Sequence, residues 1–210
     1  AGAYFNTVDI HNYDSDITTY DVKVHGWMNT NGFATAPLWI TESGSWHENK
    51  YGSASGVNNM FIANFIRGSM PGDKYVYGNH IFSMYDWNTW GSGFIAGPGA
   101  NGTKLPGYYA VRIAVRGLGP CRPTYNAAHS VNGLLAIVTK DSAGAVYLLV
   151  NGGSGALTAD LSALKTSGTG TMWKFDATNN DVIVGSPVLS NGRVTFTAAG
   201  SGGTVLLKFP

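Results

Sequence analysis

The sequence predicts a chain in two parts, an α/β part followed by an all-β part. Up to about residue 118, short apolar runs alternate with longer stretches of helical spacing, which is typical of parallel strands joined by helices. From about residue 124 onward, alternating apolar residues are broken by closely spaced turn signals, as in an antiparallel β-sandwich. Glycines and prolines gather at 117–123, so we expect domains at 1–119 and 124–210.

The α/β part reads as three strand–helix units. The spacing of apolar residues predicts strands at 7–13, 38–41 and 80–87, and helices at 19–33, 56–70 and 107–118. The strand ends at Tyr13, Glu42 and Trp87 are 29 and 45 residues apart, and a βα unit needs about 30 residues. A closed (β/α)8 barrel needs about 250 residues. The three units therefore form either an open sheet or part of a barrel whose other strands lie in another piece of polypeptide.

The all-β part is expected to contain seven or eight short strands. Turn signals lie at 141–144, 179–181 and 190–192. We expect its alternating apolar residues to form a core separate from the α/β part, including Leu135, Ile137, Val146, Leu148, Leu206 and Phe209. No catalytic residue is expected beyond about residue 124.

Composition narrows the class of ligand. Only 12% of the 210 residues are charged, the net charge is +1, and there are 6 Trp and 11 Tyr. Without a basic run, nucleic acid and anionic membranes are not expected partners. One cysteine and five scattered histidines predict no disulfide, no metal and no cofactor. The composition suits a protein that handles neutral, hydroxyl-rich ligands such as sugars, and it is also that of an ordinary β-rich extracellular domain.

Glu42 is the strongest candidate for chemistry. It is one of two glutamates, follows the apolar run 37–41, and precedes a Gly/Ser loop. In the first strand, alternation places His11 and Tyr13 together on the face away from Ile10. In the second, Ile40 shares its face with Glu42, which we expect to project inward at the strand's C-terminal mouth. His11, Tyr13, Glu42 and Trp87 could then surround one pocket, as catalytic groups do in barrels.

These elements resemble the glycoside hydrolases of clan A. In that clan the seventh barrel strand ends in a nucleophilic Glu, as 38–42 does here. The sixth often ends in His-x-Tyr, like His11-Asn12-Tyr13, and the eighth in a Trp, like Trp87. A β-sandwich behind the barrel looks like families 39 and 30. The resemblance implies about strands six to eight of a (β/α)8 (TIM) barrel, and a secreted retaining β-glycosidase with Glu42 as nucleophile. It also implies that three further residues border the sugar cleft: Trp46, Asn88 and Trp90.

The acid/base residue departs from the clan's pattern. Retaining hydrolysis needs a second carboxylate about 5–5.5 Å from the nucleophile. The clan supplies it from a Glu, usually after Asn, at the end of the fourth strand, and this sequence has no Asn-Glu pair. We therefore expect a second polypeptide or a symmetry copy to pack against the strand at 7–13 and to supply the acid/base. Glu48, in the loop at 46–48, is the alternative within the chain.

Two other interpretations stay open. The chain could be a non-catalytic carbohydrate-binding or scaffolding module with remnant pocket residues, and a carboxylate about 5 Å from Glu42 would distinguish the enzyme from it. A flavodoxin-like open sheet is the third. It is weaker because no Gly-rich loop follows the first strand, and Asp14 and Asp16 would repel a phosphate.

Overall fold

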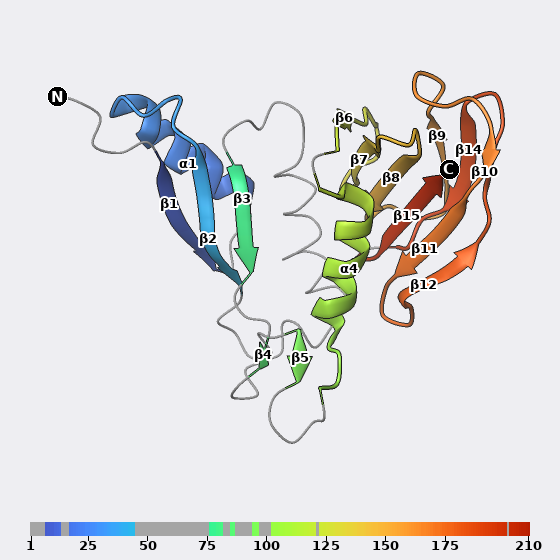
Figure 1. Ribbon diagram of the computed structural model, residues 1–210, viewed down its shortest axis with the longest axis horizontal. Coiled ribbons are helices and arrows are strands. Elements are labelled where there is room, and N and C mark those ends of the chain that lie inside the picture. Colours follow the sequence, from blue (N-terminus) through green and yellow to red (C-terminus); the bar gives the residue numbers. More distant parts are fainter. Residues whose placement is uncertain are drawn as a thin grey trace.

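The computed structural model describes residues 7–13, 17–44, 76–81, 85–86, 94–96, 102–120, 122–200 and 202–210. Within these ranges the chain forms a parallel three-stranded sheet and, further along, a β-sandwich with a helix packed on it (Figure 1). The predicted helix at 56–70 lies outside the described residues.

The parallel sheet contains β1 (Val8–Tyr13), β2 (Leu38–Gly44) and β3 (Val76–Ile81), in the order β1-β2-β3. Helix α1 (Ile17–Thr30) connects the first two strands. It ends three residues before the predicted end, because Gly32 has a φ of 83° and the N–H of Phe33 donates to Met28 O at 2.8 Å, which closes the helix. Side chains also bond its last carbonyls. Thr30 Oγ1 donates to Gly26 O at 2.9 Å, and Asn31 Nδ2 donates to Trp27 O at 2.9 Å.

The third strand differs from the prediction in both position and pairing. β3 begins at Val76 and ends at Ile81, so His80 lies near its C-terminal end rather than at its start. β4 (Tyr85–Asp86), also within the predicted strand at 80–87, pairs in parallel with β5 (Ile95–Ala96). The single strand that the apolar pattern indicated is therefore two elements among the described residues.

Helix α4 (Pro106–Leu118) begins one residue before its predicted start, because proline suits the first turn of a helix. It ends at Gly119, whose φ of 60° favours glycine and whose N–H donates to Val115 O at 2.8 Å. Arg122 Nη1 donates to the carbonyls of Arg116 at 2.9 Å and Gly117 at 3.2 Å.

Neither described helix has the length and apolar character that a membrane span requires.

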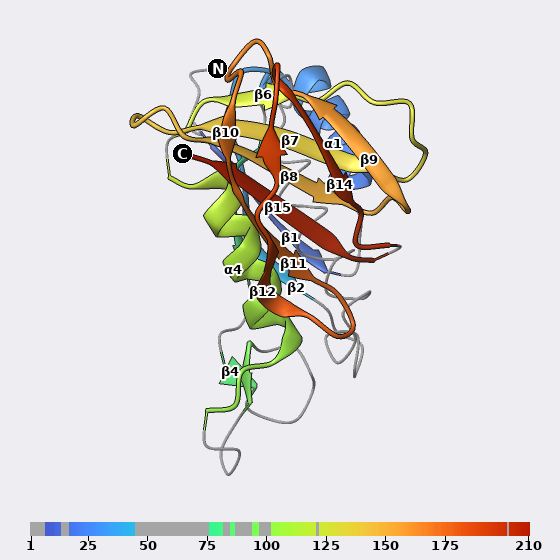
Figure 2. The same ribbon diagram turned by 90° about the vertical axis from the view of Figure 1, so that its right-hand side faces the viewer.

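The sandwich is built around a six-stranded antiparallel sheet in the order β12-β11-β15-β8-β7-β6. Two short pairs, β9–β14 and β10–β13, lie across it, as Figure 2 shows. Among the described residues after 121 there are ten strands rather than seven or eight, because β10 and β13 are only two residues long. The strands are β6 (Thr124–Asn126), β7 (Leu135–Lys140), β8 (Val146–Asn151), β9 (Ala156–Asp160), β10 (Gly168–Thr169), β11 (Thr171–Phe175), β12 (Asn180–Gly185), β13 (Val188–Leu189), β14 (Arg193–Thr197) and β15 (Thr204–Phe209).

Two of the three predicted turns are confirmed. Asp141 Oδ1 closes the β7–β8 turn by accepting the N–H groups of Ala143 at 3.0 Å and Ala145 at 2.9 Å. Asn191 and Gly192 join β13 to β14 with φ angles of 49° and 77°, the positive pair of a tight hairpin turn.

The third predicted turn, at 179–181, is displaced. Asn180 and Asp181 belong to β12, and the chain turns instead at Asp176. There Asp176 Oδ1 accepts the N–H groups of Thr178 at 2.8 Å and Asn179 at 2.9 Å. Residues 180–181 favour a turn locally, but here they pair with β11 as part of β12, and Asp181 contacts α4. These interactions outweigh the local preference.

The six-stranded sheet is covered on both faces, so the sandwich part has two cores (Figure 1). Val146, Leu148 and Phe209 face β9 and β14, as predicted. Ile137 and Leu206 pack instead against Ala110, Ile113 and Ala114 of α4, with Leu135 at the margin. For these three residues the prediction of a separate core is wrong, because alternate residues of each strand face opposite layers.

Charged side chains add to the junction between α4 and the sheet. Arg112 and Arg116, one helical turn apart, both donate to the carboxylate of Asp181 on β12, whose side chain is fully buried. Arg112 Nη2 also reaches Asp181 O at 3.1 Å, and the Arg116 guanidinium lies 4.9 Å from the Trp173 ring centroid. The two arginines thus fix α4 to the strand edge beside it.

Candidate active site on the parallel sheet

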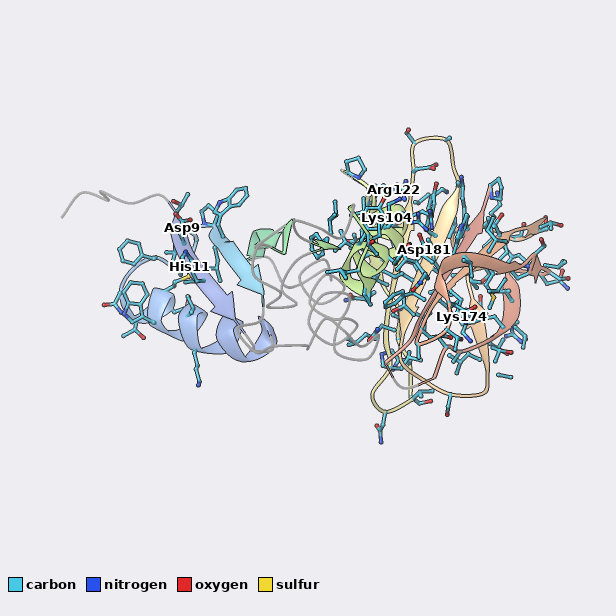
Figure 3. The ribbon with its side chains drawn as sticks, turned by 90° about the horizontal axis from the view of Figure 1, so that it is seen from below. Asp9, His11, Lys104, Arg122, Lys174 and Asp181 are labelled. Atoms are coloured by element: carbon cyan, nitrogen blue, oxygen red, sulfur yellow. The ribbon has the colours of Figure 1, made fainter. Side chains whose placement is uncertain are left out.

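The two faces of the parallel sheet differ in polarity. Ile10 pairs with Ile40 and Val8 with Leu38, and Leu38 and Ile40 are fully buried. On β1, Asp9 lies between Val8 and Ile10, His11 follows Ile10, and both Asp9 and His11 are exposed. Helix α1 runs along one side of the sheet, and Asp9 lies on the other (Figure 3). One face is thus apolar and covered, and the other carries the polar residues.

An extra residue in β2 sets the position of Glu42. Ile10 and His11 are consecutive on β1, but their partners are Ile40 and Glu42, so Thr41 has no counterpart. The register with β3 also shifts here, since Ile40 pairs with Asn79 and Ser43 with Ile81. Against β3, two residues of β2, Thr41 and Glu42, lie opposite one. β-bulges of this kind recur next to active sites, where they re-aim a side chain.

The bulge corrects one sequence-based expectation. Strict alternation would place Glu42 on the face of Ile40, the buried apolar face. The register instead sets Glu42 level with His11, on the face opposite Ile10 and Ile40. The backbone therefore brings together Glu42 and His11, and Tyr13, which pairs with Gly44, lies two positions further toward the strand end.

His80 is a residue that sequence reasoning missed. It precedes Ile81, the partner of Ser43, so it lies opposite the Thr41–Glu42 step of β2. His11, Glu42 and His80 then form one row across the three strands, which we call the Glu42 row. The missed signal was the strand boundary: a strand that starts at Val76 carries His80 to the end where the other candidates lie.

The remaining predicted residues lie outside the described part of the chain. This holds for both the substrate-binding candidates and the alternative acid/base: Trp46, Glu48, Trp87, Asn88 and Trp90. At the level of the backbone, the described row places a glutamate position between two histidine positions. Imidazole N–H groups donate to a carboxylate, and protonated imidazoles favour its ionised form.

A hollow of about 770 Å³ lies in the sandwich part, beside β9. Its floor is aliphatic, with Val138, Leu148 and Val150, and Tyr125 lies among its lining residues. The one carboxylate in its lining is Asp160, whose pKa is lowered by hydrogen bonds from Ser162 and by Arg193. This is a local turn contact on an exposed side chain, and an aliphatic floor offers little to the hydroxyl groups of a sugar.

Comparison with known proteins supplies the family context. No protein-family model matches the sequence, and no curated protein matches it. Solved structures do match the fold. Its structural neighbours are clan A glycoside hydrolases. A GH30 endoxylanase from Clostridium papyrosolvens superposes with a TM-score of 0.68 at 12% identity, over 98% of this chain and 49% of that one.

Two further neighbours agree. A glucosidase from Croceicoccus marinus has a TM-score of 0.72 at 12% identity, over 97% of this chain and 53% of that one. A GH39 β-xylosidase from Caulobacter crescentus has a TM-score of 0.71 at 13% identity, over 99% and 52%. The resemblance to families 30 and 39 is confirmed at the level of the fold. The chain spans about half the length of these neighbours.

Proposed function

We propose that this chain is the C-terminal part of a retaining β-glycosidase. Residues 1–119 would supply about strands six to eight of a (β/α)8 barrel, and residues 124–210 a β-sandwich domain. The order β1-β2-β3, with all pairs parallel and α1 between the first two strands, supports the barrel assignment. The likeness to glycoside hydrolase chains of about twice this length supports it independently.

Glu42 is the proposed nucleophile, and its pairing with His11 is the observation that carries the proposal. A Glu42 carboxylate oxygen attacks the anomeric carbon and forms a glycosyl ester, while the acid/base protonates the departing oxygen. The same acid/base then removes a proton from water, which attacks the anomeric carbon and releases Glu42. His11 or Tyr13 keeps Glu42 ionised by donating a hydrogen bond.

The substrate is a β-linked glycoside or polysaccharide. Trp46, Trp87, Asn88 and Trp90 are proposed to border the sugar cleft, because indole rings stack on the C–H faces of sugars. The neighbours include proteins named as an endoxylanase, a glucosidase and a β-xylosidase, which supports a carbohydrate substrate. A secreted enzyme fits such polymeric substrates.

The acid/base is proposed to come from outside this chain. The resemblance to clan A supports this, because that clan takes its acid/base from a Glu, usually after Asn, and this sequence has no Asn-Glu pair. A second polypeptide or a symmetry copy packed along β1 would extend the sheet and place a Glu opposite Glu42. Light scattering and mass spectrometry test this. A monomeric 210-residue chain that hydrolyses aryl β-glycosides unaided would contradict it and favour Glu48.

Covalent trapping tests the nucleophile directly. An activated 2-deoxy-2-fluoro β-glycoside carries a leaving group that needs no protonation, so labelling requires only the nucleophile and the sugar site. We expect peptide mapping to find the sugar on Glu42. In the complete enzyme, Glu42→Gln should abolish the label and lower turnover by several orders of magnitude.

Glu48→Gln is the matched control, because Glu48 is the other glutamate of the chain. It should leave labelling unchanged. A label on a different carboxylate, or near wild-type turnover in Glu42→Gln, would overturn the assignment. Sugar binding without any covalent label would favour the carbohydrate-binding module instead.

A further inference from the structure

We infer that His80 is a positioning residue for Glu42, which it flanks on the side opposite His11. The inference rests on the proposed role of Glu42 as nucleophile. It extends that proposal by assigning the carboxylate two histidine neighbours, one on each adjoining strand.

The backbone register carries the argument. Ile40 pairs with Asn79 and Ser43 with Ile81. His80 is the residue between the two β3 partners, and it lies opposite the Thr41–Glu42 step of β2. Adjacent strands are about 4.8 Å apart, and alternation sets the position of His80 on the face opposite Asn79 and its partner Ile40. The register with β1 sets the position of Glu42 on that same face, so the positions of His80 and His11 flank that of Glu42 from opposite sides.

The groups on this face define the electrostatics of the Glu42 row. β1 contributes Asp9, His11 and Tyr13, and β3 contributes His80. Asp9 is level with Trp39, on the other side of the bulge from Glu42. Within the three described strands, the two histidines are the groups that can become cationic, and Asp9 is the acid besides Glu42.

This arrangement suits a nucleophile that must stay ionised and keep one orientation. A carboxylate has two oxygens, and an imidazole on each side can hold each of them with an N–H donor. An imidazole that carries a proton on both nitrogens also favours the carboxylate form of a neighbouring glutamate.

NMR titration of the chain tests this without any need for turnover. With two glutamates in the sequence, selective ¹³C labelling gives two side-chain carboxyl resonances, and Glu42→Gln assigns them. We expect His80→Gln to raise the titration midpoint of Glu42 by about half a unit to one unit. His11→Gln should act in the same direction, and the double variant should exceed either. The buffers contain EDTA, so that bound metal does not contribute.

His129→Gln is the matched control, because His129 is an exposed histidine of the sandwich part. It should leave the Glu42 midpoint unchanged, and the Glu48 resonance reports any general effect. An unchanged Glu42 midpoint in His80→Gln would overturn the inference. Should that variant not fold, the wild-type protein decides: the His80 ring resonances must show an inflection where Glu42 titrates, and its absence is equally decisive.

The two proposals fail separately. If Glu42 is covalently labelled but His80→Gln does not change its titration midpoint, only the role of His80 is contradicted. If the midpoint shifts but Glu42 takes no label, the imidazole neighbour is supported and the role of Glu42 as nucleophile is contradicted. In an active preparation, His80→Gln should also move the acidic limb of the kcat/KM profile to higher pH, which a merely structural histidine would not do.

Discussion

The guanidinium of Arg116 pairs with the fully buried carboxylate of Asp181, 65 residues further along the chain. Arg116 lies on α4 and Asp181 on β12, so this pair joins the helix to the edge of the six-stranded sheet. A buried carboxylate that loses a charged donor bears a desolvation cost that the remaining contacts do not offset.

Arg116→Met should therefore lower the free energy of unfolding by about 2 kcal/mol. Urea unfolding followed by tryptophan fluorescence measures it. Arg193→Met is the matched control, because Arg193 and Asp160 form a 3.4 Å pair in which both side chains are exposed. The control should cost less than about 1 kcal/mol. Equal losses in the two variants would contradict a special role for the Asp181 pair.

Asp176 should make the stability of the sandwich depend on pH. Burial, the largest single influence, raises its pKa, but hydrogen bonds from Lys174, Thr178 and Asn179 together hold the pKa well below its usual range. The unfolded value is about 3.9. The contribution of the ionised Asp176 carboxylate to the free energy of unfolding is therefore complete above about pH 5. It declines as the pH falls toward the lower pKa of the folded state.

Asp176→Asn, which keeps the shape of the side chain, isolates this effect. The difference in free energy of unfolding between wild type and Asp176→Asn should be larger at pH 7 than at pH 3. Urea titrations at both pH values measure it. If the difference in free energy of unfolding is the same at pH 7 and pH 3, ionisation of the Asp176 carboxylate does not stabilise the fold.

Two helical glycines should respond oppositely to substitution. A Cβ on Gly117 would lie 3.1 Å from Leu206 Cδ1 and 3.3 Å from Leu149 Cβ, whereas a Cβ on Gly26 would meet nothing within 4 Å. Gly117→Val should destabilise by about 1–3 kcal/mol through overpacking. Gly26→Ala should stabilise by up to about 1 kcal/mol, because alanine favours the helix. Thermal unfolding distinguishes them, and a stabilised Gly117→Val would contradict the close approach of α4 to the sheet.

Deleting Thr41 should leave Glu42 reactive. In a regular strand, removing one residue inverts the faces of all residues beyond it. Here Thr41 is the extra residue, so its loss keeps Glu42 level with His11. We expect the fluoro-glycoside to label Glu42 in the deletion variant as it does in Thr41→Ala. A folded deletion variant that takes no label would mean that β2 is not bulged at this position.

Features governed by local chemistry could be predicted from the sequence, and those governed by neighbouring strands could not. Asp141 and the Asn191-Gly192 pair form the expected turns because their own backbone preferences suffice. The bulge in β2 has no local signature, since it exists only as a mismatch against the neighbouring strands. His80 was missed because β3 begins at Val76, four residues before the predicted start of that strand.

The core of the sandwich shows a related limit. Alternation correctly indicated that the residues of β7, β8 and β15 are buried, but not which layer each would meet. Ile137 and Leu206 face α4 because the helix covers the side of the sheet that an isolated sandwich would leave to solvent. A period of two fixes which residues share a face and does not say what lies against it.

The shared core of α4 and the six-stranded sheet bears on how this region could be exchanged between enzymes. A recombination point in the glycine- and proline-rich stretch at 117–123 would look safe from composition. A chimaera joined there would take Ile113 and Ala114 from one protein and Ile137 and Leu206 from the other, although these residues pack in the same core. A crossover placed before Pro106 would carry the helix together with its sheet, so the exchangeable cassette begins with α4.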